Sequence, residues 1–262
     1  MKNANTTIIL PVSRDTYLKR IFTMLDFLEC DRDHTNILVY VDGDLNLFEK
    51  ARNLTVNSNF NERLCIYRRK GLPNVGSITR RRARIAAIHN EIKELIQNTY
   101  YVFMIEDDTL FPYSTLKNLL NQYAINPHAG FISAIELGRW GFLHIGAWTV
   151  NDIYNVTQIT SIKKPQSIQK IDAAGFYCCL TRYDYYKSHT FKPYEEILGP
   201  DVDYGLSLRK QGLYNYVVPI ECVHMNKPED VSFKNQDIIQ IDLSKAGNEW
   251  NLTVISDINI QI

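Results

Sequence analysis

The sequence lacks the cysteine patterns that mark zinc modules and disulfide frameworks. Five cysteines are scattered over 262 residues, with no metal-ligand spacing and no paired arrangement: Cys30, Cys65, Cys178, Cys179 and Cys222. An odd number of scattered cysteines favours reduced thiols in a reducing compartment. The sequence also lacks an apolar run long enough to span a membrane, and its first apolar stretch is too short for a secretion signal. We therefore expect a cytoplasmic protein, in a bacterial cell or a virus-infected host cell.

No charge of either sign dominates, since 29 Lys and Arg residues balance 29 Asp and Glu residues. This balance argues against a protein whose main role is to grip a polyanion. Two local basic segments, at residues 67–71 and 80–84, keep nucleic-acid binding open as an alternative. For these segments we favour a solvated helix face with one arginine that contacts phosphate.

No internal repeat, low-complexity linker or change of composition divides the chain, so we expect one domain over residues 1–262. In the first half, apolar strand patterns alternate with helical ones. Strands are expected at 6–12, 36–44, 62–70 and 99–108, and helices at 14–30, 45–54 and 77–97. Near-continuous apolar strands between helices favour an α/β fold with a parallel sheet covered on both faces. In the second half we expect strands at 130–136 and 175–182, a helix at 202–211 and a strand ending near 224.

Acidic residues directly follow two of the expected strands. Asp42 ends the second strand, and Glu106, Asp107 and Asp108 end the fourth. Ligands bind outside the carboxyl ends of strands in such sheets, so these acids should face one crevice. Adjacent carboxylates repel one another, and a divalent cation would compensate them. The other interpretation is a solvated acidic turn before a helix, and these residues alone leave both open.

A second polar cluster lies near the C-terminal end of the expected fold. Asp201 and Asp203 begin a helix after a Gly-Pro turn, and His224 ends the following strand. Taken singly, Asp201 is explained by helix capping and Asp203 by an exposed first-turn acid. A single histidine such as His224 is more often a satisfied core or surface residue than a metal ligand.

Taken together and in order, these motifs resemble the GT-A fold of nucleotide-sugar glycosyltransferases, in particular its large inverting branch. The motifs are Pro11-Val12-x-Arg14, Asp42, the arginines within 80–84, Glu106-Asp107-Asp108, the strand GFYCCLTR (175–182), the helix PDVDYGLSLRKQG (200–212) and the strand VPIECVHMN (218–226). The resemblance covers roughly residues 6–226. It departs from the family pattern at Glu106, where Asp is usual, and at Pro200, where an acid is usual.

The resemblance implies a Rossmann-like GT-A fold, with a mostly parallel central sheet flanked by helices and a smaller acceptor-side subregion. Residues 1–112 would form the nucleotide-binding half and 113–230 the acceptor and catalytic half. Residues 231–262 would be a C-terminal extension, for which the pattern after residue 237 suggests a hairpin.

The resemblance also implies roles for single residues. Asp201 would be the general base of an inverting transfer to an acceptor hydroxyl. Asp108 and His224 would hold a divalent metal, Mn²⁺ or Mg²⁺, and Asp42 would accept from the imide N–H of a uracil base. The donor, a UDP-sugar, would be bound by Pro11, Val12, Arg14, Asp42, Arg80, Arg84, Glu106 and Asp107.

The acceptor side is the least determined part. Trp140, His144 and Trp148 of an aromatic, Gly-rich segment, with Asp203, are the candidates for acceptor binding, and loop packing explains the aromatic residues equally well. We expect a glycan or glycoconjugate acceptor, with hydroxymethylated bases of phage DNA as the alternative. Two further alternatives are a nucleotidyltransferase and a catalytically inactive nucleotide-sugar-binding module. The first is disfavoured because LPVSRDTYLKR (10–20) lacks the Gly-rich phosphate loop.

Overall fold

The structure, a computed structural model, describes residues 5–68, 78–137, 145–156, 158–192, 199–225, 238–241 and 252–255. Up to residue 125 the elements are β1 (Thr6–Val12), α1 (Leu18–Asp26), a 3-10 turn (Arg32–His34), β2 (Thr35–Val41), α2 (Leu45–Val56), β3 (Arg63–Tyr67), α3 (Ile78–Leu95), β4 (Tyr101–Ile105), β5 (Thr109–Leu110) and α4 (Thr115–Ile125). The later elements are β6 (Ala129–Leu137), β7 (Ala147–Val150), β8 (Ile159–Ser161), β9 (Gln169–Ile171), β10 (Ala173–Ala174), β11 (Cys178–Arg182), α5 (Tyr183–Ser188), α6 (Pro200–Lys210), β12 (Tyr214–His224), β13 (Ile238–Ile241) and β14 (Leu252–Ile255).

The central sheet has the strand order β3-β2-β1-β4-β11-β6-β12-β5, with β9 paired to β12. The first four strands are parallel to one another, which confirms the alternation of strands and helices expected for the first half. β11 runs antiparallel between β4 and β6, and β6 and β12 are again parallel. A parallel half of the sheet therefore joins a mixed half at the pairing of β4 with β11.

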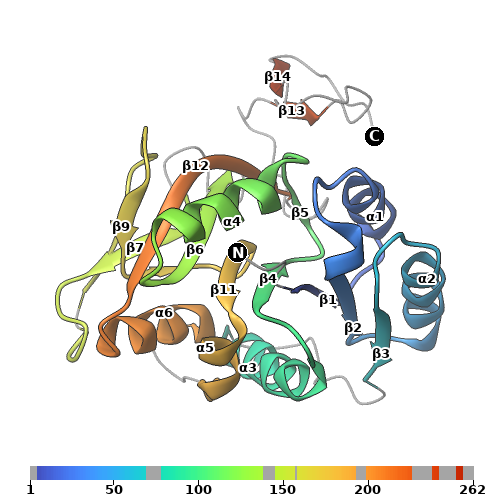
Figure 1. Ribbon diagram of the computed structural model, residues 1–262, viewed down its shortest axis with the longest axis horizontal. Helices are drawn as coiled ribbons and strands as arrows, with labels where there is room; N and C mark the ends of the chain where they lie inside the picture. The colour runs from blue at the N-terminus through green and yellow to red at the C-terminus, as the bar shows by residue number, and fades with distance from the viewer. Residues whose placement is uncertain are drawn as a thin grey trace.

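Helices cover both faces of this sheet (Figure 1). Side chains of α1, α2 and α4 pack on one face, and side chains of α3, α5 and α6 pack on the other. Alternate residues of one strand serve the two faces: Ile8 and Leu10 belong to the first core, and Ile9 belongs to the second. This alternation explains why the central strands are apolar throughout.

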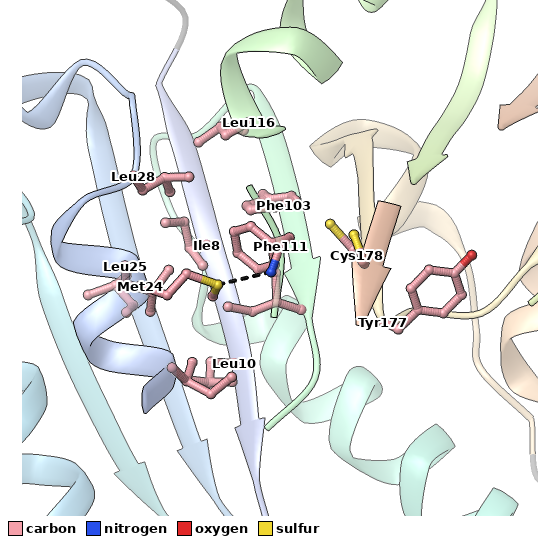
Figure 2. Close-up of a cluster of buried hydrophobic side chains, with 14 of the residues drawn as sticks. Ile8, Leu10, Met24, Leu25, Leu28, Phe103, Phe111, Leu116, Tyr177 and Cys178 are labelled. Carbon is pink, nitrogen blue, oxygen red and sulfur yellow. Dashed lines mark hydrogen bonds between the residues drawn. The ribbon is translucent and has the colours of Figure 1, made fainter. Parts of the chain in front are cut away.

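The core under α1 joins this helix to β4 and to the segment that follows β4 (Figure 2). Met24 of α1 packs beside Phe103 of β4 and Phe111, and the Phe111 backbone N–H donates to the Met24 sulfur at 3.1 Å. Phe103 and Phe111 meet edge to face with ring centroids 5.4 Å apart. This packing fixes the segment after β4, which carries the acidic residues.

Helix α1 is shorter than the helix expected at 14–30, because both ends of that segment have other partners. The backbone N–H groups of Ser13 and Arg14 donate to the Asp107 carboxylate, which keeps this part of the chain out of the helix. Beyond the helix, Glu29 donates its backbone N–H to the carbonyl of Tyr113. Among the described helices, none has the length and apolar character that crossing a membrane requires.

Two smaller sheets complete the described chain. Strands β10, β7 and β8 form a three-stranded antiparallel sheet beside α6, in the acceptor-side region expected from the sequence. In the tail, β13 and β14 pair antiparallel, with Ile238 opposite Ile255.

Candidate active site

The acidic turn after β4 is placed beside His224 by strand pairing. The turn of residues 106–109 is closed by a hydrogen bond from the Thr109 backbone N–H to the Glu106 carbonyl. β5 then pairs antiparallel with the end of β12, which puts His224 opposite Thr109. The backbone N–H of Met225 donates to the Asp108 carbonyl at 2.7 Å. Residues that lie in opposite halves of the sequence therefore share one corner of the sheet.

Glu106, Asp108 and His224 form a cluster with the character of a metal site. One ligand atom from each lies within 4.8 Å of the other two. His224 Nε2 is 2.9 Å from Asp108 Oδ1 and 3.5 Å from Glu106 Oε2. Burial lowers the pKa of His224, but hydrogen bonds to Asp108 and Glu136 outweigh burial and raise that pKa to about 10. Without a metal the imidazole is therefore charged and takes the place that a cation would fill.

Asp107 joins this turn to the segment after β1. Its Oδ2 accepts from the backbone N–H of Ser13 at 2.7 Å and of Arg14 at 3.2 Å. Its Oδ1 accepts from Arg14 Nε at 3.0 Å, and the same guanidinium reaches Asp108 Oδ2 at 3.0 Å. Burial raises the pKa of Asp107, and the neighbouring Arg14 opposes that rise. Arg14, predicted to bind the donor, thus lies directly beside the candidate metal ligands.

Asp42 lies at the end of β2, next to Val12 at the end of β1. Its backbone N–H donates to the Val12 carbonyl at 2.9 Å, and Pro11 lies opposite Tyr40 in the same strand pair. Arg84 of α3 binds Asp42 twice, with Nε on Oδ2 and with Nη2 on the backbone carbonyl at 2.6 Å. Asp42 is only 1% exposed, and no described residue forms a hydrogen bond to its Oδ1.

Asp201 occupies the first turn of α6, where Pro200 begins the helix. Proline suits this position because its missing N–H would have no helical partner. The Asp201 carboxylate folds back so closely that a Cβ at Gly199 would lie 2.3 Å from its Oδ1. Burial raises the pKa of Asp201, although the N–H groups of Val202 and of Asp201 itself, and Arg82 of α3, lower it. A raised pKa makes the carboxylate a stronger base.

Asp201 and Glu106 of the metal-type cluster both act electrostatically on Cys179 of β11. Glu106 and Asp201 both raise the pKa of the buried Cys179 thiol, after burial itself, so both carboxylates lie near this residue. Cys179 stands opposite Met104 of β4, immediately before the acidic turn. The arrangement therefore places a candidate base and candidate metal ligands around one region of the sheet.

Of the other residues predicted for the site, Asp203 and Trp148 lie in the described part of the chain. Asp203 pairs with His189, with Oδ2 and Nε2 3.2 Å apart. Trp148 of β7 is partly buried and packs against a small cluster that includes Val202 of α6. Trp140, His144 and the side chain of Arg80 lie outside the described residues.

Sequence reasoning missed Glu136, the next-to-last residue of β6. Its Oε1 lies 2.9 Å from His224 Nδ1, and its side chain is buried. The signal was present, because Glu136 is an acid at the end of an otherwise apolar strand, like Asp42 and Glu106. The sequence motifs also did not distinguish Arg82 from the neighbouring arginines. The charge of Arg82 lowers the pKa of Asp201.

Comparison with solved structures identifies the fold. The mannosyltransferase PcManGT from Pyrobaculum calidifontis, in complex with GDP-Man and Mn²⁺, matches with a TM-score of 0.61 at 14% identity, over 86% of this chain and 58% of that one. TarS from S. aureus matches with a TM-score of 0.56 at 14% identity, over 86% of this chain and 37% of that one. The chain thus spans less than two thirds of either structure. No family model and no curated protein sequence matches it. The resemblance carried by the sequence motifs is confirmed at the level of fold: the chain has the GT-A-like fold of nucleotide-sugar glycosyltransferases.

Proposed function

We propose that the protein is an inverting, metal-dependent glycosyltransferase that moves a sugar from a nucleoside-diphosphate sugar to an acceptor hydroxyl. The observation that carries this proposal is the convergence of Glu106, Asp108 and His224 at the end of the parallel half-sheet. Asp201, a carboxylate of raised pKa, is held separately on α6. This combination supports transfer rather than donor binding alone.

The three side chains of this cluster, Glu106, Asp108 and His224, suit a divalent cation. Two carboxylate oxygens and one imidazole nitrogen approach closely enough to share an ion, and the protonated His224 stands in for one. An imidazole ligand favours Mn²⁺ over Mg²⁺, which prefers oxygen ligands. When bound, the metal would offset the charge that develops on the departing nucleoside diphosphate. The similar mannosyltransferase was solved with GDP-Man and Mn²⁺, which agrees with this assignment.

Asp201 would act on the acceptor. An inverting transfer needs a base that takes the proton of the attacking hydroxyl, on the side of the sugar opposite the leaving group. Asp201 comes from α6, far in sequence from the acidic turn, and the aromatic side chain of Trp148 packs on the same helix. We propose that the acceptor lies beside Asp201 and Trp148. Asp203 is paired with His189.

The surroundings of Asp42 favour uracil as the donor base. One carboxylate oxygen is held by Arg84, so a single oxygen is left to accept from a ligand. Uracil presents one imide N–H between two carbonyl groups, and the carbonyls need donors such as the guanidinium of Arg84 or of Arg68. Guanine presents two adjacent N–H groups, which match a carboxylate with both oxygens free. We therefore expect UDP-sugars to bind better than GDP-sugars.

The acceptor we propose is a glycan or glycoconjugate in the cytoplasm, with hydroxymethylated phage DNA as the second candidate. The described part of the basic segments supports the first choice. Arg84 binds Asp42, Arg68 pairs with Glu91 at 3.0 Å, and the charge of Arg82 lowers the pKa of Asp201. These arginines are committed to the donor and catalytic side.

Thermal unfolding with UDP, GDP and their sugars, each with Mn²⁺ or with EDTA, tests the proposal. A ligand that binds only the folded chain raises the midpoint by mass action, by roughly 5 to 10 °C at a hundredfold excess over Kd. We expect a shift with UDP that needs Mn²⁺, followed by sugar transfer in an acceptor screen. A donor shift without transfer to any acceptor would favour the inactive binding module, and no shift with any nucleotide would contradict the proposal.

A further inference from the structure

We infer that Glu136 is a positioning residue for the metal ligand His224. It holds the imidazole so that Nε2 faces Glu106 and Asp108, and it makes the site selective for Mn²⁺ over Mg²⁺. The inference deepens the proposed function and rests on it, because His224 is taken as a metal ligand. It adds a residue that no motif of the sequence indicated.

Strand pairing brings Glu136 and His224 together. β6 and β12 run parallel, with Glu136 opposite Cys222, two residues before His224. The two side chains are almost fully buried, with 4% and 2% exposure, and Glu136 Oε1 lies 2.9 Å from His224 Nδ1. A buried carboxylate is costly unless it is paired. Among the described residues, His224 is the basic side chain that meets the Glu136 carboxylate.

Gly146 holds the carboxylate from the other side. Its φ is +61°, and a Cβ at this position would lie 2.3 Å from Glu136 Oε2. The strand end is tied to the same segment, because the Glu136 backbone N–H donates to the Ile145 carbonyl at 3.2 Å. The chain at residue 146 can approach this closely only without a side chain. Glu136 is therefore confined between Gly146 and His224.

This confinement determines which imidazole nitrogen meets the ion. Nδ1 faces Glu136 Oε1 at 2.9 Å, so Nε2 is the nitrogen that faces Glu106 and Asp108 and is placed to bind an ion. A carboxylate behind a ligating imidazole fixes its orientation and increases its basicity. A more basic nitrogen ligand favours Mn²⁺, whereas Mg²⁺ gains little from nitrogen. Loss of Glu136 should therefore weaken Mn²⁺ binding more than Mg²⁺ binding.

The first test is direct Mn²⁺ binding to the full chain, measured by electron paramagnetic resonance without donor or acceptor. We expect Glu136→Gln to raise the Mn²⁺ Kd about 10- to 100-fold, with a smaller change for Mg²⁺ measured by competition. Glu221→Gln is the matched control, since Glu221 of β12 pairs with Lys164 and should leave both constants unchanged. Unchanged Mn²⁺ affinity in folded Glu136→Gln would overturn the inference. A wild-type chain that binds no Mn²⁺ would instead overturn the proposed function.

The second test leaves Glu136 in place. Gly146→Ala would push a Cβ into the Glu136 carboxylate, whereas Gly212→Ala puts a Cβ on a backbone of φ +81° with nothing within 4 Å. Both substitutions strain a positive φ, so both should lower the melting temperature. Only Gly146→Ala should raise the Mn²⁺ Kd, and equal Mn²⁺ affinity in the two folded variants would contradict the role of Glu136.

Discussion

Asp108 and Asp201 are two carboxylates of one site in very different surroundings. Asp108 is 1% exposed and lies between two cationic groups, the Arg14 guanidinium and the His224 imidazole. Asp201 is partly buried, and burial raises its pKa. Catalytic sites commonly assign their acid–base roles by such a difference in environment. Under the proposed function, the same side-chain type would serve as an ion ligand at Asp108 and as a proton acceptor at Asp201.

Replacing Asp201 tests the base at the scale of one atom. Asp201→Asn keeps the shape of the side chain and removes its capacity to take a proton. We expect kcat to fall by about 10²- to 10⁴-fold, with donor affinity in the presence of Mn²⁺ changed less than threefold. Asp184→Asn, at an exposed residue of α5 that pairs with Arg182, is the control and should retain most of the activity. Wild-type turnover in Asp201→Asn would show that another group is the base.

Asp108→Asn tests the metal ligand. The amide keeps the volume of the buried side chain but binds a divalent cation more weakly than a carboxylate. We expect at least a tenfold loss, roughly 1.4 kcal/mol, in Mn²⁺-dependent UDP affinity, measured by calorimetry. UDP binding in EDTA should be little affected. Equal Mn²⁺-dependent affinity in the two proteins would remove Asp108 from the site.

At the scale of elements, one side chain links the turn between β4 and β5 to the segment after β1. Asp107 receives two backbone N–H groups and the Arg14 guanidinium, and so fastens this turn to the end of β1. Asp107→Asn should lower the free energy of unfolding by about 2 to 4 kcal/mol, because it leaves buried donors poorly paired. Urea denaturation measures this loss.

The control for this anchor is Asp15→Asn, because Asp15 is exposed and pairs only with Lys50 among the described residues. An exposed pair of this kind contributes about 0 to 1 kcal/mol. If both variants lost the same stability, the anchoring role of Asp107 would be wrong.

Much of this arrangement was accessible from the sequence, since strand ends are visible where an apolar run stops at an acid. That rule located Asp42 and the acidic turn, and applied to β6 it would also have located Glu136. What it could not supply is the pairing of β6 with β12, which alone explains why Glu136 faces His224. Nor could it tell Arg82 from Arg84, because their neighbours, Asp201 of α6 and Asp42 after β2, belong to two different elements.

Across the whole molecule, the face covered by α3, α5 and α6 contains a buried histidine. His89 is 3% exposed, and its Nδ1 lies 2.8 Å from the Tyr186 hydroxyl. The rings of Phe176 and Phe191 lie 4.5 and 5.1 Å from its ring. Burial, with a smaller effect of His189, lowers the pKa of His89 to about 3. The folded chain therefore keeps this side chain neutral.

This neutral histidine makes stability depend on pH. Above pH 6.5, His89 is neutral in both the folded and the unfolded chain. Below pH 6.5 the unfolded chain binds a proton at His89, whereas the folded chain does so only near pH 3. Stability attributable to His89 is thus lost as pH falls through this window, by about 2 kcal/mol between pH 7 and 5. Between pH 7 and pH 5, the free energy of unfolding of His89→Gln, measured by urea denaturation, should fall by about 2 kcal/mol less than that of wild type. Identical losses in wild type and in His89→Gln would contradict the prediction.

The pairing of β5 with β12 also governs when the site can exist. These strands lie more than one hundred residues apart in the chain, so their contact forms only after a long loop has closed. During synthesis, His224 leaves the ribosome long after the acidic turn has been made. A nascent chain therefore exposes Glu106 and Asp108 without their third partner. Under the proposed function, metal binding would therefore be a late event, coupled to completion of the sheet, and a chain that stalls before β12 would lack the third ligand.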